Sequence, residues 1–235
     1  MLKAVLFDLD DTLFDHRHSS REALSVLQSE YLEIGGVNMD ELEAANLEIL
    51  NSIHVEVLAG TITPDQAREK RFGIILAKYG VVASSEKLRD LAVHYRSKYQ
   101  LSRRAVPGAK ELLHALRHRS LKTAIISNNL VEEQMDKLQH CELLNLLDSL
   151  TISEEAGFAK PDPRIFEIAL DRLQCKPDES IMIGDSWEND ILGARNAGIS
   201  SIWYNCYLTE LPDTSFSEIR SLEDSEFIIR LLSSF

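Results

Sequence analysis

The sequence has few cysteines, no long apolar run and no low-complexity tract, and each of these absences excludes a class of protein. Its three cysteines, Cys141, Cys175 and Cys206, are widely spaced and form no C-x-x-C pair. This pattern excludes a disulfide framework and a thiolate zinc site, and it favours a reducing compartment. The first apolar run is too short for a signal peptide, and no later run is long enough to cross a bilayer. We therefore expect a cytoplasmic protein that binds no membrane.

Basic residues are also scarce relative to acidic ones. The 235 residues include 38 Asp and Glu but only 25 Lys and Arg, which gives a formal net charge of -13 at pH 7. Such a chain is repelled on average by nucleic-acid backbones, so we expect no nucleic-acid partner. A hydrophobic fraction of 44% and a charged fraction of 27% are typical of a globular chain with one large domain or two modest ones.

Short apolar runs alternate with segments of helical spacing along most of the chain. The runs that we predict to be buried strands are 3–7, 123–126, 150–152, 181–183 and 201–204. The segments with helical spacing include 109–118, 131–138, 163–173 and 188–197. This alternation predicts an α/β fold with a Rossmann-like three-layer core, in which helices cover both faces of a parallel sheet.

One long segment, from residue 15 to residue 101, contains no strand-like run. It carries apolar residues at helical spacing, such as Leu24 and Leu27, and Thr63 and Gln66 have the spacing of a capping box. We therefore predict two domains. Residues 1–14 and 102–235 form the Rossmann-like core, and residues 15–101 form an inserted, all-helical cap domain.

Two acidic residues follow the first predicted strand. Side chains alternate along an extended chain, so Asp8 and Asp10 are expected to project to the same side. Two carboxylates in one small space repel each other unless a cation or a proton intervenes. Ligands of open α/β sheets bind at the carboxyl ends of the strands, where this pair is placed. The alternative is a solvated acidic turn that caps a helix.

Polar residues also follow the second and third predicted strands. Ser127 and Asn128 come directly after the run 123–126, at the start of a predicted helix, where N–H groups can hold phosphoryl oxygens. Lys160 lies beside prolines that restrict the backbone, in the sequence Lys160-Pro161-Asp162-Pro163. Considered alone, Ser127 and Asn128 are also ordinary N-cap residues, and a lysine is more often a solvated surface residue than a ligand.

The fourth predicted strand ends at a glycine and two acids. Gly184 is followed by Asp185, and Asp190 lies in the first turn of the next predicted helix. Magnesium favours about six oxygen ligands, and Asp8 and Asp185 supply carboxylates for such an ion. Asp190 is explained either by the helix dipole or by a role at, or next to, the metal.

Together these motifs resemble the four-motif signature of the haloacid dehalogenase (HAD) superfamily of phosphohydrolases. The motifs occur in the order of that signature, at successive strand ends, and span nearly the whole chain. A single motif of this kind is common, but four motifs in this order at successive strand ends argue against a purely structural interpretation. The long helical insert after the first strand is similar to the cap of the subgroup whose cap follows that strand. The residues that carry the resemblance are Asp8, Asp10, Thr12, Ser127, Lys160, Gly184, Asp185 and Asp190.

The resemblance implies a role for each of these residues. Asp8 is expected to be the nucleophile that forms an aspartyl phosphate, and Asp10 the general acid and base. Asp8, Asp185 and the main-chain carbonyl of Asp10 are expected to hold Mg²⁺. Lys160 is expected to have a catalytic role and to bind the phosphoryl oxygens, together with the Ser127 hydroxyl and the amide of Asn128. Thr12 is expected to brace the loop, and Asp190 to lie at or next to the metal.

The resemblance predicts a Mg²⁺-dependent phosphatase that acts on a small-molecule phosphate monoester. Asp10 argues against a dehalogenase, which needs no acid at that position. The alternatives are a sugar-phosphate phosphatase, a phosphomutase with the same residues, and a HAD-like protein that binds a phosphorylated ligand without turnover. Residues 60–66, with Arg71 and Phe72, are similar to caps of 5′-nucleotidases and N-acylneuraminate-9-phosphatases. A nucleoside 5′-monophosphate is therefore the first expected substrate.

Overall fold

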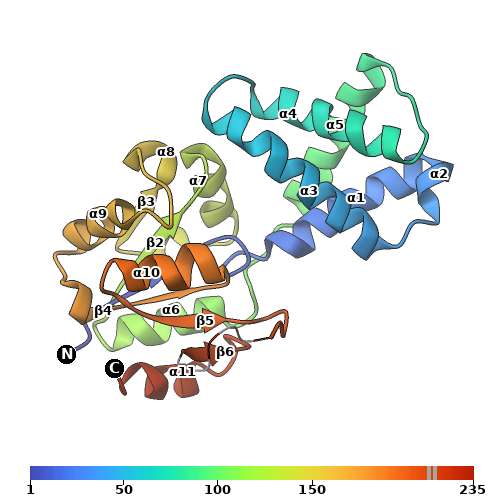
Figure 1. The fold of residues 1–235 in the computed structure, drawn as a ribbon. Helices are drawn as coiled ribbons and strands as arrows, with labels where there is room; N and C mark the ends of the chain where they lie inside the picture. Colours follow the sequence, from blue (N-terminus) through green and yellow to red (C-terminus); the bar gives the residue numbers. More distant parts are fainter. Residues whose placement is uncertain (211–212, 214–215) are drawn as a thin grey trace. The chain divides into compact units, whose positions relative to one another are not determined.

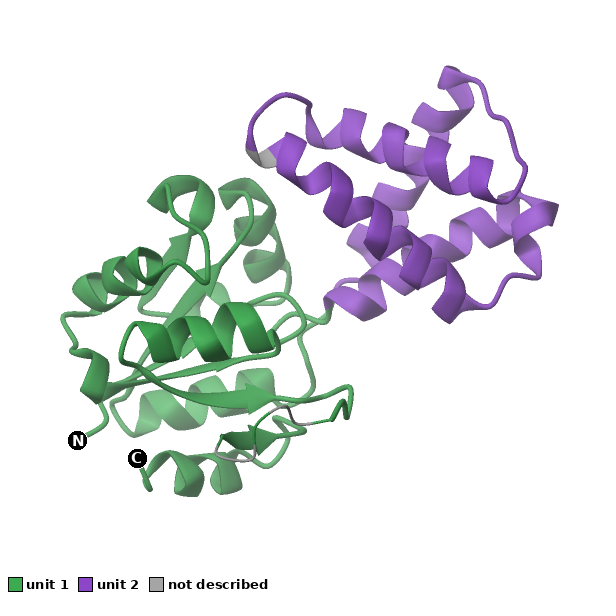
Figure 2. Ribbon diagram, in the orientation of Figure 1, with its two compact units in different colours: residues 1–15, 104–235 green, residues 16–103 purple. Residues whose placement is uncertain are grey.

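The computed structural model describes residues 1–210, 213 and 216–235, apart from the side chain of Leu58. The chain divides into two compact units (Figure 2). Unit 1, the core unit, contains residues 1–15 and 104–235, and unit 2, the helical unit, contains residues 16–103. The predicted boundaries, 14/15 and 101/102, lie within two residues of these positions. None of the described helices is both long enough and apolar enough to cross a membrane.

The core unit is built on one parallel sheet with the strand order β3-β2-β1-β4-β5-β6 (Figure 1). Its strands are β1 (Ala4–Phe7), β2 (Lys122–Ser127), β3 (Ser149–Ile152), β4 (Ser180–Gly184), β5 (Ser200–Tyr204) and β6 (Ser217–Ile219). The five predicted strands are therefore present. The sixth was not predicted, because β6 has only three residues and only Ile219 is buried. A single apolar residue gives no periodic signal.

Helices cover both faces of this sheet, as the sequence predicts. The helical elements of the core unit are α6 (Ala109–His118), α7 (Val131–His140), η1 (Leu144–Leu146), α8 (Ser153–Ala156), α9 (Pro163–Leu173), η2 (Pro177–Glu179), η3 (Trp187–Leu192), α10 (Gly193–Asn196) and α11 (Ser225–Leu232). Leu6 and Met182 of the sheet pack with Phe166 of α9 and Ala194 of α10 in one buried cluster. Helices α6 and α11 contact each other, and α6 contacts β2. Burial of this kind of apolar surface is the main favourable term in folding.

The segment 188–197, predicted as one α-helix, is different in the structure. A π-helical turn, η3, precedes the short helix α10. Its wide turn follows from the main chain, because the N–H of Ile191 donates to the carbonyl of Ser186, five residues earlier. The Ser186 side chain also caps the turn by accepting from the N–H of Asn189. The prediction was correct about helical character but wrong about its type.

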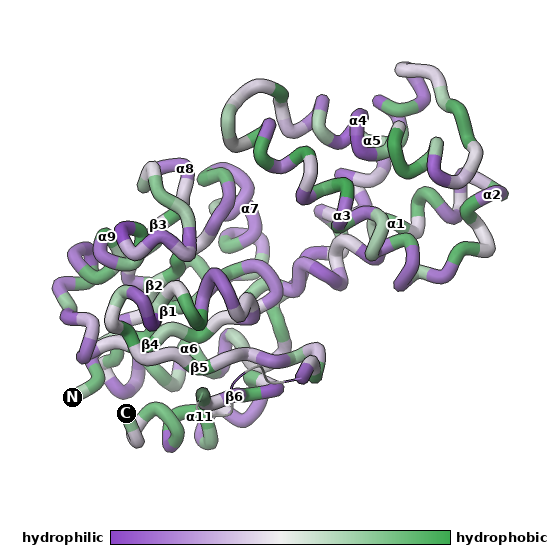
Figure 3. Tube along the Cα trace, viewed as in Figure 1, coloured by the Kyte–Doolittle hydropathy of each residue, from purple (hydrophilic) through white to green (hydrophobic). Residues whose placement is uncertain are grey.

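The helical unit consists of five helices. They are α1 (His16–Glu30), α2 (Leu32–Gly35), α3 (Met39–Leu58), α4 (Pro64–Lys78) and α5 (Ser85–Leu101). The predicted capping box at the start of α4 is present, since Thr63 and Gln66 exchange two hydrogen bonds of 3.2 and 2.9 Å. Apolar and polar residues alternate along these helices (Figure 3). Leu24 and Leu91 are among the apolar residues that this amphipathic pattern buries.

Candidate active site

Three of the predicted site residues lie at the carboxyl ends of adjacent strands. Asp8 follows β1, Ser127 ends β2 and Asp185 follows β4, and β1 pairs with both of the other strands. The chain turns tightly after Asp8, because the carbonyl of Leu9 accepts hydrogen bonds from the N–H groups of three residues later in the loop, Thr12, Leu13 and Phe14. This edge of a parallel sheet is where open α/β folds bind their ligands.

Lys160 is buried between two carboxylates. Its Nζ lies 2.5 Å from Oδ1 of Asp8 and 2.7 Å from Oδ1 of Asp190, and only 3% of the lysine side chain is exposed. Burial lowers the pKa of Lys160, but the charges of Asp190 and Asp8 outweigh burial and hold that pKa above its ordinary value. Lys160 is therefore a fixed positive charge, and the alternative of a solvated surface lysine is wrong.

Burial raises the pKa of both Asp8 and Asp185. The pKa of Asp8 is raised to about 7 by burial, with Asp190 adding to the rise and Lys160 opposing it. The pKa of Asp185 is raised to about 9 by burial and then by the charges of Asp8 and Asp190. A single ammonium group therefore does not balance the three carboxylates, and the site favours an additional cation.

The donor atoms of this cluster fit a magnesium-type ion. Asp8, Asp185 and Asp190 each offer a carboxylate oxygen, and these oxygens lie within 4.8 Å of one another. Carboxylate oxygens are the protein ligands that such hard cations prefer. The three residues differ in the other hydrogen bonds that their carboxylates accept. Asp190 is fully buried and accepts from Lys160 and from the N–H of Ser186 at 3.0 Å. Asp185 accepts a longer bond of 3.4 Å from the hydroxyl of Thr12.

Gly184 makes room for Asp190. A Cβ atom at position 184 would lie 2.3 Å from Oδ2 and 2.4 Å from Cγ of Asp190. These separations are far below van der Waals contact, so an alanine at this position would displace the carboxylate. A glycine at the end of β4, directly before Asp185, therefore allows the Asp190 side chain to approach the main chain closely.

The side chain of Asp10 contacts two residues of α7 and Asn129, which precedes that helix. Its Oδ1 lies 2.5 Å from Nζ of Lys137, and its Oδ2 accepts from the side-chain amides of Gln134 at 2.8 Å and Asn129 at 3.3 Å. Gln134 also donates to Oγ of Ser127 at 2.6 Å. Gln134 and Lys137 were not among the predicted site residues. The available signal was that two polar residues one turn apart occupy the face of α7 that also buries Leu138.

The Asn128 side chain contacts Lys160 instead of pointing into the site. Its Nδ2 donates to the carbonyl of Lys160 and its Oδ1 accepts from the N–H of Lys160, both at 2.7 Å. Only the amide of Asn128 was predicted to act, as a phosphate ligand. The side chain, which holds the Lys160 segment in place, was not predicted to have a role.

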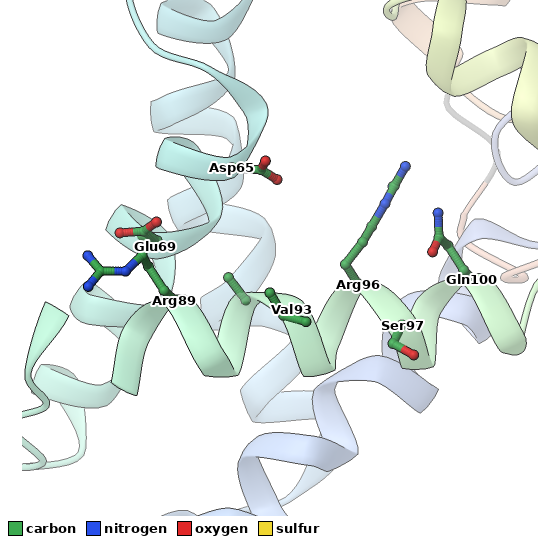
Figure 4. Close-up of a pocket in the computed structure, with 8 residues that line it drawn as sticks. Asp65, Glu69, Arg89, Val93, Arg96, Ser97 and Gln100 are labelled. Carbon is green, nitrogen blue, oxygen red and sulfur yellow. The ribbon is translucent and has the colours of Figure 1, made fainter. Parts of the chain in front are cut away.

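The helical unit contains a separate groove between α4 and α5. Its volume is about 380 Å³. Asp65 and Glu69 line it from α4, while Arg89 and Arg96 line it from α5, so that its walls carry opposite charges (Figure 4). The motif residues converge in the core unit, and we therefore place the candidate active site there.

The sequence matches a known family model over most of its length. The model, described as haloacid dehalogenase-like hydrolase, covers residues 2–198. Glyceraldehyde 3-phosphate phosphatase of Methanothermobacter thermautotrophicus is 33% identical over 218 residues, which are 89% of this chain and 88% of that protein. Pyrimidine 5′-nucleotidase YjjG of Escherichia coli is 32% identical over 212 residues, with the same two coverages of 89% and 88%.

A solved structure shares the fold over nearly the whole chain. The HAD-hydrolase YfnB of Bacillus subtilis, determined bound to magnesium, superposes with a TM-score of 0.75 at 26% identity. The match covers 97% of this chain and 99% of that chain.

Proposed function

Because the chain belongs to the haloacid dehalogenase-like hydrolase family, we propose that it is a Mg²⁺-dependent phosphatase that forms an aspartyl-phosphate intermediate on Asp8. The match over residues 2–198 confirms the family that the four motifs resemble. Since this is a family of hydrolases, the chain is a hydrolase. The observation that carries the proposal is the buried contact of Lys160 with Asp8, at the sheet edge where Asp185 also lies. A carboxylate held against a fixed ammonium group is suited to attack phosphorus.

Asp8 is the nucleophile of the proposed reaction. Its carboxylate attacks phosphorus, a bond forms between the carboxylate oxygen and phosphorus, and the bond from phosphorus to the ester oxygen breaks. Lys160 favours the ionised form of Asp8 that this attack needs. Water then cleaves the acyl phosphate and releases inorganic phosphate, so a difficult displacement is divided into two easier ones.

Asp10 is the acid and base. It gives a proton to the departing ester oxygen in the first step and takes a proton from the attacking water in the second. Its side chain is 26% exposed, whereas that of Asp8 is 12% exposed. Asp10 therefore keeps an open side that solvent or a leaving group can reach.

The transferring phosphoryl group is bound by Lys160, by the hydroxyl of Ser127 and by the main-chain amide of Asn128. Fixed donors and a buried positive charge stabilise the negative charge on the phosphoryl oxygens more strongly than water does. The side chain of Asn128 supports the same function indirectly, because it holds the main chain of Lys160.

Asp8, Asp185 and the main-chain carbonyl of Asp10 are the proposed ligands of Mg²⁺. When bound, the ion offsets the charge of the carboxylates and of the phosphoryl oxygens. Asp190 lies within the same carboxylate cluster, and it also holds Lys160 and the N–H of Ser186. Thr12 braces Asp185.

The proposed substrate is a small phosphate monoester, and a nucleoside 5′-monophosphate is the first candidate. The relative YjjG, named a pyrimidine 5′-nucleotidase, supports it at 32% identity. A sugar or triose phosphate is the second candidate, supported by the 33% identical relative named glyceraldehyde 3-phosphate phosphatase. We propose a cytoplasmic location, where its three thiols stay reduced, and no nucleic-acid or membrane partner.

A phosphate-release screen tests the proposal. Nucleoside monophosphates, sugar phosphates and p-nitrophenyl phosphate are incubated with the full chain and Mg²⁺, and Asp8→Asn is measured in parallel. We expect release of phosphate by the wild-type protein, loss of release in Asp8→Asn, and loss of release in EDTA with recovery on adding Mg²⁺. Full activity of Asp8→Asn, or full activity in EDTA, would refute the mechanism. An isomerised sugar phosphate in place of free phosphate would identify a mutase.

A further inference from the structure

Helix α7 presents two buried polar side chains to the candidate active site. Gln134 has no exposed surface, and the side chain of Lys137 is only 4% exposed. They are buried on the same helix as Leu138, whereas the other residues of α7 are partly or fully exposed. Burying an amide and an ammonium group is costly unless each finds partners. An apolar pair would pack on this face without that cost, so the contacts of these two residues need a specific explanation.

Lys137 is directed at Asp10. Its Nζ lies 2.5 Å from Oδ1 of Asp10 and 5.2 Å from the ring centroid of Phe14. The Phe14 ring lies beside the ammonium group of Lys137, and the Asp10 carboxylate neutralises the charge of that group. The pair therefore fixes one oxygen of Asp10 in a partly enclosed position.

Gln134 connects Asp10 with Ser127. Its Nε2 lies 2.8 Å from Oδ2 of Asp10 and 2.6 Å from Oγ of Ser127, whereas its Oε1 is buried with no hydrogen-bond partner among the described residues. The opposite amide orientation would place Oε1 against a carboxylate oxygen, so the nitrogen must face both groups. Both N–H protons of the amide are then used.

This arrangement determines the direction in which Ser127 can donate. Because Oγ of Ser127 accepts from Gln134, its own O–H proton is available for another acceptor. A phosphoryl oxygen at the sheet edge is such an acceptor. The same amide thus orients the acid–base carboxylate and the phosphate-binding hydroxyl together.

We propose that Gln134 and Lys137 are positioning residues that hold the Asp10 carboxylate and the Ser127 hydroxyl in reactive orientation. The inference rests on the proposed function, in which Asp10 protonates the leaving group. In the proposed reaction neither residue transfers a proton to the substrate or binds the phosphoryl group. They act through Asp10 and Ser127. Gln134 and Lys137 themselves lie one turn apart on α7.

Leaving-group dependence distinguishes this role from a general contribution to folding. p-Nitrophenolate is stable as an anion and leaves without a proton, whereas an alkoxide must be protonated as it departs. The ratio kcat/KM covers the steps up to leaving-group departure. Loss of the acid orientation should therefore reduce kcat/KM for alkyl phosphates and leave kcat/KM for p-nitrophenyl phosphate nearly unchanged.

The test is a double-mutant cycle on the full chain with Mg²⁺, using the best alkyl phosphate ester from the phosphate-release screen beside p-nitrophenyl phosphate. We expect Lys137→Met to lower kcat/KM for the alkyl ester by about 100-fold and for p-nitrophenyl phosphate by less than about 3-fold. In the Asp10→Asn background the same change should have less than about a 2-fold effect, because Lys137 acts through Asp10.

Two further variants keep the result interpretable. Lys110→Met is the matched control, since Lys110 pairs with Glu142 at 2.6 Å on the surface of the same unit and should leave both rates unchanged. Lys137→Gln replaces Lys137→Met if the latter does not fold, and a selective loss on the alkyl ester is again expected. Equal losses on both substrates, or effects that multiply in the double variant, would overturn the inference. A wild-type protein that releases no phosphate would instead overturn the proposed function.

Discussion

The side chain of Asn128 holds the main chain of Lys160 by two hydrogen bonds of 2.7 Å, one in each direction. The pair joins the end of β2 to a segment that lies 32 residues further along the chain. Lys160 itself reaches the two carboxylates through its long side chain. The position of the ammonium group therefore depends on an amide that never contacts it.

Asn128→Ala is predicted to misplace Lys160. Both hydrogen bonds are lost and the main chain of Lys160 is left without these partners, so we expect kcat/KM to fall by about 10- to 100-fold and stability to fall by about 1–3 kcal/mol. Steady-state rates of phosphate release and urea denaturation check the two effects. Asn196→Ala, on an exposed residue at the end of α10, is the control. Unchanged rates in Asn128→Ala would contradict this account.

The sequence was sufficient to predict a parallel sheet covered by helices on both faces and to identify the polar residues that follow its strands. Buried parallel strands are nearly continuous apolar runs, and β1 with the sequence AVLF is an example. Residues that closely follow such runs lie at the carboxyl edge of a parallel sheet. The apolar runs, together with the family resemblance of the motifs that follow them, therefore led to the expectation that Asp8, Ser127 and Asp185 share one site.

The residues that were missed act through contacts that have no local signal. Gln134 and Lys137 look like the solvated face of a helix, and only the position of Asp10, more than 120 residues away, explains their burial. The π-helical turn at Trp187–Leu192 depends on one shifted hydrogen bond rather than on composition. Tertiary contacts of this kind override local propensity.

Gly184→Ala is predicted to weaken the site through Asp190. The added Cβ would lie 2.3 Å from Oδ2 of Asp190, so the carboxylate must move away from Lys160 and from the N–H of Ser186. We expect a loss of stability of about 1–3 kcal/mol and a fall in kcat of about 10-fold or more. Thermal unfolding and phosphate release measure them.

Gly36→Ala is the matched control for this change, because a Cβ at position 36 meets no atom within 4 Å and the residue has a φ of -97°. We expect its melting temperature and activity to equal those of the wild type. A Gly184→Ala protein with full activity would show that Asp190 can move without consequence for Lys160.

The stability of the metal-free protein is predicted to fall as pH rises. The pKa values of Asp8, about 7, and Asp185, about 9, lie well above the ordinary value of 3.8 for an aspartic acid. Between about pH 4 and pH 9 the folded state therefore binds more protons than the unfolded state, and the free energy of unfolding decreases with pH. This sign is opposite to that of a carboxylate in a favourable ion pair.

Melting temperatures in EDTA and in Mg²⁺, measured from pH 5 to pH 9, check this prediction. We expect the melting temperature in EDTA to decrease across this range, and Mg²⁺ to raise it most at the alkaline end, because the cation replaces the missing protons. Asp185→Asn should flatten the profile in EDTA and remove most of the response to Mg²⁺. A melting temperature in EDTA that increases with pH would contradict the raised pKa values.

Arg71→Met is predicted to stabilise the helical unit. Arg71 is buried in α4, its Nε has no hydrogen-bond partner among the described residues, and its guanidinium lies 4.8 and 4.9 Å from the ring centroids of Phe72 and Tyr95. Methionine keeps an unbranched apolar stem and removes the buried charge, which costs more than cation–π contacts of about 0.5–2 kcal/mol return. We therefore expect stability to rise by about 1 kcal/mol.

Urea denaturation followed by circular dichroism at the helical band measures this change, with Lys70→Met as the matched control. Lys70 lies one residue away on the same helix, its side chain is 47% exposed and it pairs with Glu56 at the surface, so its removal should alter stability by less than about 0.5 kcal/mol. If Arg71→Met instead lowers the urea midpoint, the two aromatic rings stabilise the guanidinium by more than its desolvation costs. The comparison thus determines which of the two opposing effects is larger at this buried position.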